Sequence, residues 1–76
     1  MPRNWHVINA RDCPEVTYTR TRQGKIFFYD VREPQVPIAF TIVPVPYRLC
    51  RMDGSDVVAR PLPNILACQI ALRDRL

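Results

Sequence analysis

Glycine, histidine and lysine are scarce in this sequence, and their scarcity excludes several classes of function. The chain of 76 residues contains two glycines, one histidine and one lysine. It has no glycine-rich loop to hold a phosphate, no HExxH pair to hold zinc and no GxSxG turn to present a serine nucleophile. We therefore expect a protein that is not an enzyme and that binds no cofactor.

The cysteines are few, and their spacing suits neither a disulfide framework nor a metal site. Cys13, Cys50 and Cys68 are far apart, and no two of them form a CxxC pair. A nucleophile pair of His6 with Cys13 would also need an orienting group and an oxyanion donor, which nothing in the sequence marks. We expect no metal, small buried thiols at Cys50 and Cys68, and a reducing, intracellular location. One disulfide between two of the three cysteines stays open as an alternative.

Long hydrophobic runs are also absent. The longest apolar stretch, VPIAFTIVPVPY, contains three prolines and is too short to cross a bilayer. Apolar residues make up 47% of the chain and charged residues 24%, as in ordinary globular proteins. We expect one domain over residues 1–76 with no membrane association. A core this small, which buries roughly 60% of the unfolded surface, has little room for an enclosed active site.

Two segments rich in threonine, aromatic and β-branched residues predict a first hairpin. Val16 to Arg22 and Lys25 to Val31 flank Gln23-Gly24, a pair typical of a two-residue turn. The pairs that such a turn would set are Arg22 with Lys25, Arg20 with Phe27, Tyr18 with Tyr29, and Val16 with Val31. This register gathers aromatic and basic side chains on one face of the hairpin.

Four further segments indicate strands. Residues Trp5 to Asn9 form a short first strand. Ile38 to Val43 is apolar on both faces, which is typical of a central strand, and Pro44 and Pro46 end it. The segments Tyr47 to Met52 and Ser55 to Arg60 flank Asp53-Gly54, the strongest hairpin signal in the chain. The expected pairs in this second hairpin are Arg51 with Asp56, Cys50 with Val57, and Leu49 with Val58.

The end of the chain predicts a helix. Ile65, Cys68 and Leu72 recur at helical spacing, and Pro63 suits the first turn. The predicted fold is therefore α+β, with four or five mostly antiparallel strands and one C-terminal helix. The two hairpins are centred on Gln23-Gly24 and Asp53-Gly54.

The net charge of +4 comes mainly from arginine, and the first hairpin carries the most suggestive cluster. Arginine suits bidentate contacts to carboxylate or phosphate, although a GC-rich genome produces the same bias. Exposed aromatic rings with arginines are common in protein interfaces. We expect a non-enzymatic module for protein–protein interaction. The predicted contact residues are Arg20, Arg22, Lys25, Phe27 and Tyr29, with Trp5 as an outlying candidate.

Two other interpretations of the hairpin stay open. Sheets that bind nucleic acid stack bases on aromatic rings and hold phosphate with arginine, so segment 17–30 is an alternative nucleic-acid surface. In the structural interpretation, the rings pack under the sheet and Arg20 covers Phe27 through a cation–π contact.

The small size also favours action through surfaces. An open strand edge would allow a homo-oligomer, and the four prolines of segment 34–46 could guard one such edge. The length, arginine content and missing motifs suit an accessory protein of a virus, such as a phage, or of a mobile element. Such a protein would complete an assembly or inhibit a complex in the host cytoplasm.

Overall fold

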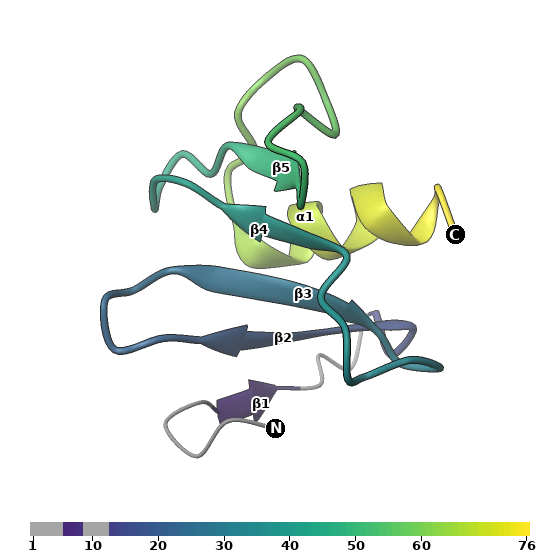
Figure 1. Cartoon of the computed structure of the whole chain (residues 1–76). Helices are drawn as coiled ribbons and strands as arrows, with labels where there is room; N and C mark the ends of the chain where they lie inside the picture. The colour runs from purple at the N-terminus through teal and green to yellow at the C-terminus, as the bar shows by residue number, and fades with distance from the viewer. Residues whose placement is uncertain (1–5, 9–12) are drawn as a thin grey trace.

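The computed structural model describes residues 6–8 and 13–76, which form five strands and one helix (Figure 1). The elements are β1 (His6–Ile8), β2 (Val16–Arg20), β3 (Ile26–Asp30), β4 (Ala39–Thr41), β5 (Leu49–Arg51) and α1 (Ile65–Arg73). This arrangement confirms the predicted α+β fold. No helix within these residues is long and apolar enough to span a bilayer.

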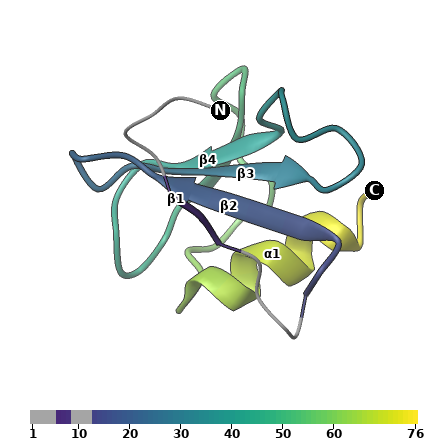
Figure 2. The same ribbon diagram turned by 90° about the horizontal axis from the view of Figure 1, so that it is seen from below.

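All five strands join one antiparallel sheet in the order of the chain, β1-β2-β3-β4-β5. Strand β4 lies between β3 and β5, which agrees with its apolar residues on both faces. Helix α1 runs along one side of the sheet (Figure 2). We call this the helix side of the sheet and the other the opposite side.

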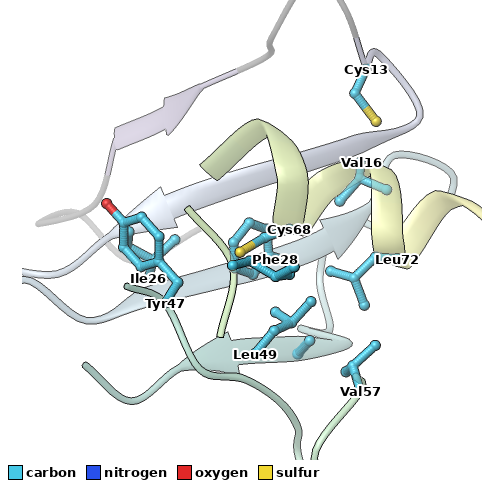
Figure 3. Close-up of a cluster of buried hydrophobic side chains, with 11 residues drawn as sticks. Cys13, Val16, Ile26, Phe28, Tyr47, Leu49, Val57, Cys68 and Leu72 are labelled. Carbon is cyan, nitrogen blue, oxygen red and sulfur yellow. The ribbon is translucent and has the colours of Figure 1, made fainter. Parts of the chain in front are cut away.

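The apolar core lies between the helix side of the sheet and α1, and Thr17, Thr19, Tyr29 and Cys50 on the opposite side are buried as well. Phe28 at the centre of β3 is fully buried and belongs to the same cluster of buried side chains as Cys68 of the helix (Figure 3). Other residues of this cluster are Cys13, Val16, Ile26, Ala39, Tyr47, Leu49, Val57, Leu62 and Leu72. All three cysteines are buried and free, so Cys50 and Cys68 are the small buried thiols expected and no disulfide forms.

The predicted register of the first hairpin is wrong by one residue. Arg20 pairs with Ile26, and Tyr18 pairs with Phe28. The turn has three residues rather than two, because Thr21 N–H bonds to Lys25 O at 2.8 Å. A two-residue turn with glycine second needs a positive φ at Gln23 as well, which costs a side-chain-bearing residue about 1–2 kcal/mol. The three-residue turn needs a positive φ only at its last residue, Gly24, whose φ is +85°.

The second hairpin departs from the prediction in the same way. Arg51 N–H bonds to Ser55 O at 2.7 Å, and Gly54 has a φ of +91° at the last turn position. Cys50 therefore opposes Asp56 rather than Val57, and this contact is an isolated bridge. The expected strand from Ser55 to Arg60 does not form.

The charge pairing expected across this hairpin also changes. Asp56 Oδ1 accepts a bond from Arg48 Nε at 2.8 Å, not from the Arg51 side chain. Arg51 Nη1 instead donates to the backbone oxygen of Asp56 at 2.6 Å.

Helix α1 begins at Ile65, two residues after the proline expected in its first turn. Asn64 is the N-cap, and its side-chain oxygen accepts a bond from Ala67 N–H at 2.7 Å. Pro63 thus precedes the helix instead of occupying its first turn. Within the helix, the buried Gln69 donates through Nε2 to Val16 O at 2.7 Å, which ties α1 to the start of β2.

Candidate interaction surface

The observed register separates the aromatic rings that the sequence places together. Tyr18 lies on the helix side, with its ring 6.2 Å from that of the core residue Phe28. Phe27 and Tyr29 lie on the opposite side, because they alternate with Phe28 along β3. Tyr29 is only 3% exposed, and its hydroxyl accepts a long bond of 3.4 Å from Thr19 Oγ1. The prediction of one aromatic and basic face is therefore wrong.

Lys25, rather than Arg20, makes the cation–π contacts of the hairpin. Its Nζ lies 5.1 Å from the ring centre of Phe27 and 4.4 Å from that of Phe40 on β4. The two rings are 6.1 Å apart, so one ammonium group covers a pair of half-buried aromatics. Arg20 shares the helix side with Ile26, and this placement takes it away from Phe27.

The predicted basic contact residues do gather at one end of the sheet. Arg20 ends β2, Arg22 lies in the turn and Lys25 precedes β3, and all three are exposed. Trp5 lies outside the described residues. The remaining predicted contact residues, Phe27 and Tyr29, are half-buried and buried respectively.

An exposed apolar loop lies at the same end of the sheet, between β4 and β5 (Figure 1). Ile42, Val43 and Val45 are 46%, 54% and 69% exposed, and Pro44 and Pro46 beside them are exposed as well. Five consecutive exposed apolar residues are unusual on a surface that contacts only water. We call residues 42–46 together with Arg20, Arg22 and Lys25 the tip surface.

This loop has a recognisable signal in the sequence. Proline cannot donate to a sheet ladder, so Pro44 and Pro46 force the chain out of the sheet. The neighbouring apolar residues, Ile42, Val43 and Val45, therefore lie outside the sheet and are exposed. The two prolines that follow β4, together with the apolar residues beside them, are therefore the sequence signal for this loop.

Several ionisable groups of the described residues are held in structural contacts. A hydrogen bond from Arg48 lowers the pKa of Asp56, and one from Arg32 lowers the pKa of Asp30. Burial raises the pKa of the Cys68 thiol to about 12, so this thiol stays protonated and unreactive near neutral pH. No three His, Cys, Asp or Glu side chains in residues 13–76 and the β1 segment gather to hold a metal ion.

The sheet edge at β5 is covered by the chain itself. Val57 N–H bonds to Leu49 O at 2.9 Å, and Ser55 O accepts from Arg51 N–H. The prolines of segment 34–46 flank the interior strand β4, so they guard no edge. Strand β1 lies at the other edge of the sheet.

Comparison of the chain with protein-family models finds no match, and comparisons with curated proteins and with solved structures also find none.

Proposed function

We propose that the chain is a non-enzymatic interaction module that binds a protein partner through the tip surface. The observation that carries this proposal is the exposed loop 42–46 beside exposed basic side chains. Burying its aliphatic residues would be favourable by roughly 25 cal/mol per Å² of apolar area. The flanking Arg20, Arg22 and Lys25 favour a partner cleft with an acidic border.

The same surface suits nucleic acid less well. Stacking with bases needs exposed aromatic rings, and the described tip residues contribute aliphatic and proline side chains instead. Tyr29 is buried, and Lys25 covers the half-buried Phe27. A phosphate backbone offers no apolar surface against which Val43 and Val45 could be buried. Nucleic-acid binding by segment 17–30 remains the competing proposal.

Two finer parts of the proposal concern where the protein acts. Three free, buried thiols support an intracellular location, where cysteines stay reduced. A chain this short that acts by occupying a surface suits an accessory protein of a virus or mobile element, which completes an assembly or inhibits a host complex.

Site-specific photo-crosslinking tests the proposal. A photoreactive amino acid replaces Val45 in the tip loop, and a matched variant carries it at the exposed Gln35, in the β3–β4 loop at the opposite end of the sheet. After irradiation in extract from the cells that produce the chain, we expect a discrete protein adduct from position 45 alone. The charge reversals Arg22→Glu and Lys25→Glu should reduce its yield severalfold.

Two outcomes would contradict a protein partner at the tip. Equal adducts from positions 45 and 35 would show random collisions rather than a defined surface. An adduct that nuclease removes would support the nucleic-acid alternative.

A further inference from the structure

Helix α1 is unusual because its outer side is apolar as well as its inner side. No residue from Ile65 to Leu72 carries a charge, and all nine helical residues are buried or half-buried. Cys68 and Leu72 face the core, and Ile70 projects from the opposite side because two residues turn a helix by about 200°. A helix that lies on the surface normally places polar residues there.

A groove lies beside this outer side of α1. Its volume is about 360 Å³. The apolar lining consists of Val58 and Leu62 from the segment before the helix and of Ala67, Ile70 and Ala71 from α1. The two alanines are four residues apart, so they leave room for another element to approach the helix closely.

The charged residues around the groove make its border positive. Arg60, Asp74 and Arg75 line it. Arg73 lies 3.7 Å from Asp74 and offsets this carboxylate, which is the acidic group among the described residues that line the groove. Arg75 Nη1 donates to Ala71 O at 2.7 Å, and this bond holds the guanidinium at the groove. A second copy of the chain would bring the same arginines and a net charge of +4, which disfavours self-association here.

Two parts of the groove wall, Leu62 and helix α1, offer no free backbone groups to an added strand. Leu62 N–H bonds to Tyr47 O at 2.7 Å, and Tyr47 N–H bonds to Leu62 O at 2.8 Å. An occupant must therefore satisfy its own backbone, as a helix does. We propose that this groove binds an acidic amphipathic helix of a protein partner, with apolar side chains against Ala67, Ile70 and Ala71 and carboxylates near Arg60 and Arg75. This groove shares no residue with the tip surface, so the chain would bridge two protein segments.

A model peptide tests this proposal without knowledge of the natural partner. The probe is a peptide of about 18 residues with leucine at helical spacing and glutamate elsewhere, and a matched peptide has lysine in place of glutamate. The full chain, labelled with ¹⁵N, is titrated with each peptide and observed by NMR. We expect the acidic peptide to shift the amide signals of Val58, Ala67, Ile70 and Ala71, and the basic peptide to leave them in place.

Three variants assign the binding to the groove. Ile70→Glu should weaken the acidic peptide at least about ten-fold, and Arg60→Glu should weaken it severalfold while reducing its salt dependence. Arg60→Glu changes an exposed residue, so it keeps the test valid if Ile70→Glu disturbs folding. The matched control is Gln35→Glu, which adds the same charge to the exposed β3–β4 loop and should leave affinity within about two-fold.

Several results would overturn the proposal. These are the absence of shifts, equal shifts with both peptides, or shifts confined to the tip surface. Shifts of the groove signals on concentrating the chain alone would show that a second copy covers the groove. Failure here would leave the tip proposal intact, because the crosslinks at position 45 involve none of these residues.

Discussion

The register of the first hairpin can be tested by replacing Gln23 with glycine. In the observed three-residue turn, Gln23 does not have a positive φ and gains nothing from a glycine. The added freedom of the unfolded chain should then destabilise the protein by about 0.5–1 kcal/mol. In a two-residue turn, Gln23 would have a positive φ, and glycine would relieve about 1–2 kcal/mol of strain. The two registers therefore predict opposite signs for one substitution.

Urea denaturation measures this sign. A slope of about 1 kcal/mol per molar for a chain this small converts the expected loss into a midpoint lower by roughly 0.5–1 M. Gln23→Ala is the control, because alanine keeps a Cβ and should shift the midpoint by less than half as much. A midpoint that rises with glycine would refute the three-residue turn and the separation of Tyr18 from Tyr29 that depends on it.

Three other predictions concern contacts that hold the fold together. Gln69→Leu leaves the oxygen of Val16 without its buried donor and should cost about 1–3 kcal/mol in urea denaturation, whereas a smaller loss would mean that the bond is replaced. Asn64→Ala removes the N-cap and should cost about 0.5–2 kcal/mol by the same assay, and Asn64→Asp should cost much less; equal losses would argue against the cap. For Asp56, the hydrogen bond from Arg48 lowers the pKa in the folded protein below the unfolded value of about 3.9. The stability that this hydrogen bond contributes is therefore present above about pH 4 and is lost as the pH falls through the folded pKa. Asp56→Asn should therefore lower the denaturation midpoint at pH 7, and the difference from the parent chain should vanish in acid; a difference that persists at low pH would contradict the assignment.

The elements of this fold are predictable from local patterns. Threonine and aromatic residues around Gly24, the apolar run before Pro44 and the helical spacing of Ile65, Cys68 and Leu72 each indicate the structure that forms. The observed ends of these elements differ from the predicted ends by one or a few residues, because the sequence pattern alone does not show where the backbone hydrogen bonding stops. The N-cap is also a local signal, since asparagine directly precedes the first helical residue.

The length of the first hairpin turn decides which side chains lie together on the surface. Turns of two and three residues differ in the backbone conformation of Arg22 and Gln23, and this difference changes every cross-strand partner. The wrong turn length placed Tyr18 with Tyr29 and made Arg20 the partner of Phe27. The contact of Lys25 with Phe40 involves a third strand, so no rule within the hairpin could have predicted it.

The measurement that tests the central claim most directly is binding to labelled single- and double-stranded oligonucleotides across a series of salt concentrations. If the tip surface binds protein, affinity near physiological salt should be undetectable, and weak binding at low salt should disappear as salt rises. Measurable affinity at physiological salt, with a log–log slope that flattens in a chain carrying Arg20→Ala and Arg22→Ala, would contradict the account. Such a result would make the hairpin a nucleic-acid surface.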